Sequence, residues 1–332
     1  MKCIYCSKNL TSETRQEHVL QDAIGGRWKS PRIVCNDCQD FFSKTIDGQL
    51  ADQMMPFKFM INAKSGLSGR SINRSIQVFD EKGGFVWLKA GCVVDDTKPS
   101  VEVLGRNAAG EVDFVNVTVR DMAQKGHADA VAKSLVGENR IRMEVPAKQL
   151  PPELHQRAED RVFMMPFRFE QPYLARALAK ACFNLIGVVC QEIPFCEGFV
   201  RLKQFVLEKG LGSLPYWEFF KYLVAEPELR LPAIGAFDHF ICAYSGVGTC
   251  DAFVRLWGEV PFLLRLSSSY DGPDFKCSYL VSPVAAGDGV GVRQVKNPDF
   301  DPAALPCFEV GDFDAGNLYL QAARRFTEKS GL

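Results

Sequence analysis

The sequence has almost no net charge, because its 39 Lys and Arg residues are balanced by 40 Asp and Glu residues. A protein that binds nucleic acid through an overall basic surface is therefore excluded, and any such surface must be local. Long apolar runs are also missing, since the most apolar stretch, residues 181–190, is too short to span a bilayer. The N-terminus has no apolar run and no small-residue cleavage site, so we expect no signal peptide. These absences predict a cytoplasmic protein without a membrane partner.

Histidine is scarce as well, with four residues in 332, and no internal repeat or low-complexity tract occurs. The composition, 47% hydrophobic and 24% charged, is that of an ordinary globular protein. The length suits a small module joined to a larger domain. Composition along the chain predicts a metal-binding N-terminal module at 1–55, a basic connector at 56–78 and an α+β domain of unknown role at 79–332.

Hydrophobic spacing predicts both helices and strands, and hence an α+β fold. A stripe of apolar residues with a spacing of four predicts a helix over 39–54, formed by Phe42, Ile46, Leu50 and Met54. The longest helical pattern covers 173–191, and shorter patterns cover 121–135, 199–209 and 214–225. Strands are predicted within 84–120 and at 238–244, 252–257, 260–267 and 277–282.

Twelve cysteines are many for a chain expected in a reducing compartment, and their placement separates two groups. Four occur in the first 38 residues as two Cys-x-x-Cys pairs. The other eight are scattered, mostly in apolar runs, and we interpret them as buried hydrophobic side chains: Cys92, Cys182, Cys190, Cys196, Cys242, Cys250, Cys277 and Cys307.

The two pairs have the spacing Cys3-x2-Cys6-x28-Cys35-x2-Cys38. Two such knuckles can share one tetrahedral Zn²⁺, with four thiolates at roughly 2.3 Å from the ion. Four thiolates leave no open position for water, so the predicted zinc is structural. A redox pair or four buried thiols are the alternatives. The 28-residue insert between the knuckles is long enough to need structure of its own.

The insert carries a second pattern. Glu17-His18-Val19 is followed by Gly25-Gly26 and, after the second knuckle, by Phe-Phe-Ser-Lys-Thr-Ile-Asp at 41–47. With this order of motifs, residues 3–50 resemble the HNH endonuclease family in its zinc-bearing ββα-metal form. The chain is most similar to stand-alone bacterial proteins of that family, in which a basic segment follows the nuclease module and a helix resembles the one around Ala179-Lys180-Ala181.

The resemblance implies a metal-dependent endonuclease that hydrolyses phosphodiester bonds of DNA, with RNA left open as a substrate. His18 then activates the attacking water as general base, and Glu17 holds one Mg²⁺ or Mn²⁺ ion. A neutral imidazole suits the first task and a hard carboxylate the second. The resemblance further implies a role in bacterial defence or in a mobile element, with the domain at 79–332 regulating the nuclease.

Some positions depart from the family pattern. The family usually has Asn directly after the last zinc cysteine, as second ligand of the divalent ion, where this chain has Gln39 and then Asp40. Gln39 keeps a carbonyl oxygen on a longer arm and is our predicted second ligand, because Asp40 points about 100° away on the helix. Arg32 lies near another position where the family often has Asn. Asp47 matches the family but lies about 12 Å from Gln39 along the helix, so we predict a structural role for it.

The connector is basic. No Asp or Glu occurs between Asp52 and Asp80, and residues 1–75 hold eleven Lys and Arg against seven Asp and Glu, a net charge of +4. We predict that four side chains of this segment contact a nucleic-acid backbone: Lys58, Lys64, Arg70 and Arg74. A solvated linker is the alternative.

A protein without catalysis is the rival interpretation. In it the zinc-held module binds nucleic acid or a partner, the HNH site is degenerate, and His18 only packs. Gln39 and Arg32 favour the rival, whereas the spacing of Glu17 and His18 favours the enzyme. The domain at 79–332 then acts through a protein or ligand partner, which its sequence does not identify.

Overall fold

The computed structural model describes residues 1–60, 75–80, 84–89, 93–94, 98–119, 130, 163–164, 171–208, 215–222, 237–258, 260–283 and 294–305. Helices and antiparallel sheets both contribute, which confirms the α+β class. The chain divides into two compact units. The larger contains Met1–Lys58, Ala63–Arg70 and Phe169–Leu332, and the smaller contains Phe59–Asn62 and Ser71–Arg168.

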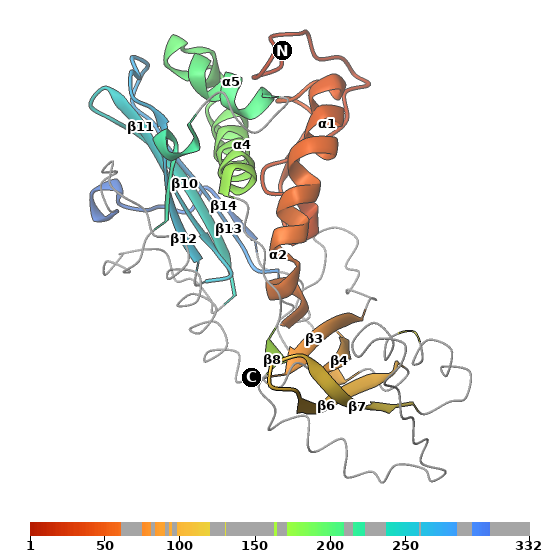
Figure 1. Ribbon diagram of the computed structural model, residues 1–332. Coiled ribbons are helices and arrows are strands. Elements are labelled where there is room, and N and C mark those ends of the chain that lie inside the picture. Colours follow the sequence, from red (N-terminus) through yellow and green to blue (C-terminus); the bar gives the residue numbers. More distant parts are fainter. Residues whose placement is uncertain are drawn as a thin grey trace. The chain divides into compact units, whose positions relative to one another are not determined.

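A six-stranded antiparallel sheet forms the centre of the larger unit, with strand order β14-β13-β10-β11-β12-β9. Its strands are β9 (Phe220–Tyr222), β10 (His239–Gly246), β11 (Thr249–Leu256), β12 (Val260–Ser267), β13 (Lys276–Val281) and β14 (Gln294–Lys296). The strands predicted from 238 onward are thus confirmed. Helix α4 (Gln171–Val189) packs on this sheet through β10 and β13, and α5 (Val200–Leu207) packs beside α4 (Figure 1). Short 3₁₀ turns surround these elements, at Ile193–Phe195, Glu197–Phe199, Tyr216–Glu218 and Pro302–Ala304.

Helix α4 is the buried core helix of the unit. Side chains around its whole circumference are buried, which includes the predicted apolar stripe but also two charged residues, Arg176 and Lys180. Among the described residues, Pro172–Val189 is the one helical stretch long and apolar enough to cross a membrane by length and composition, and 78% of it is buried inside the protein. A core helix of a soluble protein meets the same two criteria, so this finding is weak evidence for a membrane span.

A second helical run covers Asn36 to Met60. It consists of α1 (Asn36–Phe42), a π-helical turn (Ser43–Asp47) and α2 (Gly48–Met60). The predicted stripe of Phe42, Ile46, Leu50 and Met54 is fully buried, which confirms this helix. A strict spacing of four drifts by about 120° over twelve residues of an α-helix. The wider π turn takes up one extra residue, so the four side chains stay on one face.

The smaller unit holds a second sheet, ordered β7-β6-β4-β3-β8, with β5 paired to β4. Its strands are β3 (Ile76–Asp80), β4 (Phe85–Lys89), β5 (Val93–Val94), β6 (Ser100–Arg106), β7 (Val112–Thr118) and β8 (Phe163–Met164). Every pairing is antiparallel. The strands predicted within 84–120 are confirmed, and the helix predicted at 121–135 lies outside the described residues apart from position 130.

One predicted helix is wrong. Residues 214–225 contain a 3₁₀ turn at Tyr216–Glu218 and then the edge strand β9. Phe220 pairs with Leu264 and Tyr222 with Phe262 across the sheet. Pairing with a long neighbouring strand outweighs a weak local preference for helix.

The scattered cysteines divide in two by burial. Cys182, Cys242, Cys250 and Cys277 are buried, as predicted, whereas Cys190 and Cys196 are half-buried. Cys92 and Cys307 lie outside the described residues. The buried members behave as small core hydrophobes.

The N-terminal module packs against the sheet and α4 within the larger unit. The hydroxyl of Tyr279 on β13 accepts hydrogen bonds from the backbone N–H groups of Arg27 and Trp28, at 3.0 and 3.1 Å. These contacts join the insert to a strand about 250 residues away.

A second anchor of the insert is His239 on β10, which is completely buried. Its Nε2 lies 2.7 Å from the carbonyl oxygen of Ile24, and its Nδ1 accepts the N–H of Trp257 at 3.0 Å. This pattern requires the neutral imidazole with its proton on Nε2. Burial lowers the pKa of His239 from 6.5 to about 4.

The anchor predicts a pH dependence of stability. The unfolded chain takes up the His239 proton as pH falls through about 6.5, while the folded protein resists it until about 4. The contribution of neutral His239 to the free energy of unfolding is therefore fully present above pH 6.5, the pKa of the unfolded chain. About 3 kcal/mol of it is lost as pH falls from 6.5 to about 4. Denaturant unfolding of wild type and His239→Gln at pH 7 and pH 4.5 should show a smaller pH effect in the variant. Equal pH effects in the two proteins would contradict this assignment.

Candidate functional site

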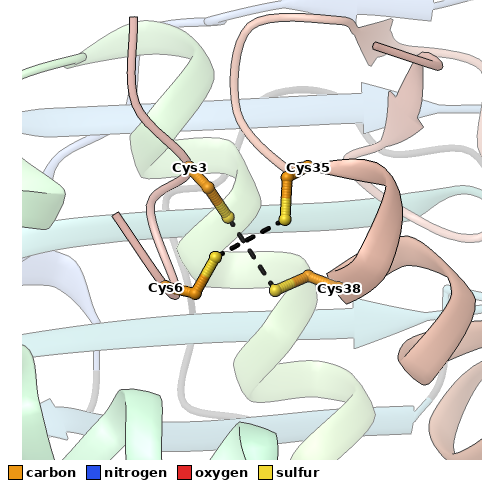
Figure 2. A group of neighbouring side chains, drawn as sticks. All are labelled: Cys3, Cys6, Cys35 and Cys38. Atoms are coloured by element: carbon orange, nitrogen blue, oxygen red, sulfur yellow. Dashed lines mark hydrogen bonds between the residues drawn. The ribbon is translucent and has the colours of Figure 1, made fainter. Parts of the chain in front are cut away.

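Four thiols meet at one point of the N-terminal module. The Sγ atoms of Cys3, Cys6, Cys35 and Cys38 all lie within 4.8 Å of one another and point toward a common centre (Figure 2). Cys3 and Cys38 are 3.9 Å apart, and Cys6 and Cys35 are 3.5 Å apart. Sulfurs bound at 2.3 Å to a tetrahedral Zn²⁺ are about 3.8 Å apart. The residues therefore fit a four-thiolate zinc site.

Local backbone geometry forms each knuckle. In the first, the N–H of Ser7 donates to the carbonyl of Cys3 at 3.0 Å, and Ser7 has a left-handed φ of 60°. In the second, Cys35 is the N-cap of α1, and the N–H of Gln39 donates to its carbonyl at 3.0 Å. The knuckles are joined directly, because the N–H of Ile4 donates to the carbonyl of Ile33 at 2.9 Å.

The insert forms a short hairpin. Strand β1 (Glu17–His18) pairs with β2 (Lys29–Ser30), and a 3₁₀ turn at Asp22–Ile24 leads into the two glycines. Gly25 has a φ of 100°, and a Cβ on Gly26 would lie 1.8 Å from the carbonyl oxygen of Leu20. The Gly-Gly step is therefore required for the chain to return closely on itself.

His18 lies at the end of β1 with its side chain 25% exposed. Its Nε2 makes no hydrogen bond within the described part of the chain and lies 4.0 Å from Oδ1 of Asp22. Burial lowers the pKa of His18, Lys29 and Lys180 act in the same direction, and Asp22 opposes them. The imidazole is therefore neutral near pH 7, with a nitrogen able to accept a proton.

Glu17 points to the other side of β1, toward α4. Its Oε1 lies 2.6 Å from Nζ of Lys180, which also lies 2.8 and 3.0 Å from the two carboxylate oxygens of Asp47. The Lys180 side chain is 2% exposed and that of Glu17 is 10% exposed. Burial opposes the charge of Lys180, but the two carboxylates outweigh it, so its pKa is raised above the ordinary value. We call these three residues the Lys180 cluster.

Neutral polar side chains surround the Lys180 cluster. Nδ2 of Asn184, one turn after Lys180 on α4, donates to the carbonyl of His18 at 2.9 Å. The Tyr5 hydroxyl donates to Oδ1 of Asn184 at 3.0 Å, and Nε2 of Gln21 donates to Asp47 at 2.9 Å. Two side chains of α4 therefore hold β1 in place, because Asn184 bonds to the backbone of His18 and Lys180 to the carboxylate of Glu17.

The two side chains predicted to bind the divalent ion both contact other groups of the protein. Glu17 is engaged by an internal ammonium. Gln39 is buried, and its Nε2 donates to the carbonyls of Arg15 and Val34 at 2.9 and 3.0 Å. Gln39 therefore braces the loop before β1 against α1. Asp40 forms an exposed ion pair with Arg15 at 2.5 Å, and Asp47 has the structural role predicted for it.

The basic connector is described only at its start. Lys58 lies in α2, is 9% exposed, and donates from Nζ to the carbonyl of Ala23 at 2.7 Å. Lys58 was predicted to contact a nucleic-acid backbone, whereas in this structure its ammonium bonds to the turn after β1. Lys64, Arg70 and Arg74 lie outside the described residues.

Sequence reasoning missed Lys180 and Asn184. A signal was present, because Lys180 and Asn184 occur with a spacing of four within a largely apolar helix. Such residues are rarely buried without partners. What the sequence lacked was any indication of which partner they contact, since Asn184 lies 166 residues from His18.

Comparisons with known proteins agree with the site. Residues 3–55 match the HNH endonuclease family, a stretch that contains both knuckles, the insert and the start of α2. No curated protein and no solved structure was found to match the chain. The N-terminal module is therefore similar to HNH endonuclease domains, and this similarity points to a nuclease-type function.

Proposed function

We propose that the N-terminal module is an endonuclease that hydrolyses phosphodiester bonds of DNA, with His18 as the general base. The observation that carries this proposal is the state of His18, because its side chain is 25% exposed, its lowered pKa keeps the imidazole neutral, and its buried Nε2 makes no hydrogen bond among the described residues. A base must hold a free lone pair within reach of a water molecule. The HNH match supplies the reaction class.

The hairpin also brings a cation next to the base. Lys29 pairs directly with His18 across the two strands and is exposed. Residues opposite one another in such a pair have Cβ atoms about 5 Å apart. Lys29 therefore supports the proposal as the group that would neutralise a phosphate beside His18.

Zinc holds this hairpin in shape. The four thiolates would join the segment before β1 to the N-terminus of α1, and the ion itself would touch no substrate. A cytoplasmic location follows from the same proposal, since thiolate zinc sites persist in reducing compartments.

Cleavage of supercoiled plasmid tests the proposal. Wild-type protein should nick or linearise the plasmid, and His18→Ala should not, in parallel reactions with Mg²⁺, with Mn²⁺ and without added divalent ion. Comparison of the three reactions shows whether cleavage requires a divalent ion. A matched RNA substrate shows whether the protein cleaves DNA, RNA or both. A wild-type protein of full zinc content that cuts neither substrate under any condition would contradict the proposal.

A further prediction concerns the basic connector. If Lys64, Arg70 and Arg74 contact phosphates, replacing all three with Ala should reduce the slope of log Kd against log salt by about 2.7. The matched control is Lys58→Ala, which should leave this slope unchanged, because Lys58 is buried and bonded to Ala23. Fluorescence anisotropy with a labelled duplex between 50 and 200 mM salt measures both slopes. An unchanged slope in the triple variant would assign the segment as a linker.

A second candidate function is nucleic-acid binding without cleavage. The engagement of Glu17 by Lys180 and of Gln39 by backbone carbonyls favours it, because these are the two side chains expected to hold the catalytic ion. The anisotropy measurement separates the candidates. Binding that His18→Ala leaves unchanged, in a protein that never cuts, identifies the module as a binding domain.

A further inference from the structure

The strongest unused feature of the molecule is the Lys180 cluster. It combines two carboxylates and one ammonium, a net charge of −1, and Lys180 and Glu17 are both buried. Every charged contact in it is short, between 2.6 and 3.0 Å. Lys180 comes from α4, far outside the family-matching stretch of residues 3–55.

A cation is thus already present where the resemblance expects a divalent ion. A buried ammonium separated from its carboxylates keeps its charge without compensation, which is strongly unfavourable. A divalent ion bound to Glu17 would also repel Lys180, whose Nζ lies 2.6 Å from the same carboxylate oxygen. Mg²⁺ loses its own water reluctantly, so it gains little from a carboxylate oxygen that already contacts an ammonium.

Two further contacts hold α4 in place against the module. Asn184 donates to the carbonyl of His18 at 2.9 Å, and the N-terminal knuckle packs closely on the same helix. A Cβ on Gly187 would lie 3.0 Å from Cδ1 of Ile4, so only glycine allows this approach without a shift. Lys180, Asn184 and Gly187 follow one face of α4 at spacings of four and three.

We propose that the ammonium of Lys180 is the permanent counter-ion of Glu17 and Asp47. The charge of Glu17 is then compensated by this side chain from α4 and not by a divalent metal ion. The site of the N-terminal module is then completed by a helix from the C-terminal part of the chain. The inference concerns the occupancy of Glu17 and stands whether or not the module cleaves nucleic acid, so its failure is distinguishable from failure of the proposed function.

Direct Mn²⁺ binding to the full-length, zinc-loaded protein tests the inference, with free Mn²⁺ followed by electron paramagnetic resonance. Glu17→Gln removes the carboxylate charge and leaves Lys180 with Asp47. The expected result is an Mn²⁺ affinity within threefold of wild type, equal to that of the control Glu13→Gln, which removes an exposed carboxylate of the same type. A weakening of more than threefold in Glu17→Gln alone would overturn the inference, because Glu17 would then be an ion ligand.

A second variant tests whether the ammonium of Lys180 is the reason that a divalent ion does not bind Glu17. Lys180→Met removes the ammonium and leaves two carboxylates, so a folded Lys180→Met protein should bind Mn²⁺ at least tenfold more tightly than wild type. The double variant Glu17→Gln/Lys180→Met should lose this gain. A folded Lys180→Met protein with wild-type Mn²⁺ affinity would contradict the inference, and if that variant does not fold, the Glu17→Gln result decides.

Discussion

Removal of zinc is expected to unfold the N-terminal module. The hairpin of β1 and β2 has only two residues in each strand, and the segment before β1 contributes no other regular element. Structural Zn²⁺ binding contributes about 10–16 kcal/mol in small zinc modules, comparable to the whole stability of a typical domain. Cys38→Ser should therefore reduce bound zinc from one equivalent to none. It should also abolish hydrogen-exchange protection of the amides of Val19 and Gly26, which are bonded within the hairpin.

A matched cysteine outside the cluster provides the control. Cys196 is a half-buried free thiol, and Cys196→Ser should keep one zinc per chain and the same exchange pattern. Atomic absorption measures the metal in protein purified without chelator. A wild-type protein that contains no zinc, or a Cys38→Ser protein that retains a full equivalent, would contradict the site.

Loss of His18 is expected to reduce DNA cleavage by about 10²–10⁴-fold, the usual contribution of a general base. This corresponds to about 3–5 kcal/mol of the activation barrier. The fold should be preserved, because the contacts that hold β1 in place use the His18 carbonyl and the Glu17 carboxylate and not the imidazole. Single-turnover cleavage of His18→Ala at saturating protein measures the chemical step without a contribution from binding.

The pH dependence gives an independent check on the same residue. Because the pKa of His18 is lowered, the base form persists to more acidic pH than for an ordinary histidine. The wild-type rate should therefore decline only below pH 6.5, and the decline should be absent from the residual activity of His18→Ala. His155→Ala, which removes a histidine that belongs to no motif, should cut like wild type. Wild-type cleavage rates in His18→Ala would end this assignment.

Helix α4 contacts the N-terminal module, although the two lie far apart in the sequence. A module of about 50 residues matches the HNH family, and its strand β1 is held by residues of a helix that begins at Gln171. Lys180 and Asn184 contact opposite ends of the Glu17-His18 step. An isolated fragment of residues 1–60 would leave Glu17 and Asp47 without their cation.

Local spacing in the sequence was sufficient for the four-cysteine cluster and for most of the regular structure. Two Cys-x-x-Cys knuckles place their sulfurs by short turns, so the four thiols could be assigned without knowledge of the fold. The apolar stripe from Phe42 to Met54 predicted the helix, because its spacing depends only on the geometry of that helix. The predicted roles of Cys182 and Cys242 as core residues held for the same reason, since apolar neighbours along the chain accompany them into the core.

The tertiary structure alone decided the partners of the charged and polar side chains. Glu17 contacts Lys180, the Asn36–Met60 helical run places Asp47 beside the same ammonium, and His239 and Tyr279 bond the insert from the sheet. Lys58, predicted to contact nucleic acid, is likewise a buried donor to the carbonyl of Ala23. The physical reason is that a buried charge needs compensation at a distance of about 3 Å, and the chain can supply it from any segment that packing brings near. Sequence spacing determines the type of an element and its apolar face. Only tertiary packing determines which two elements are in contact, and therefore which charged side chains pair.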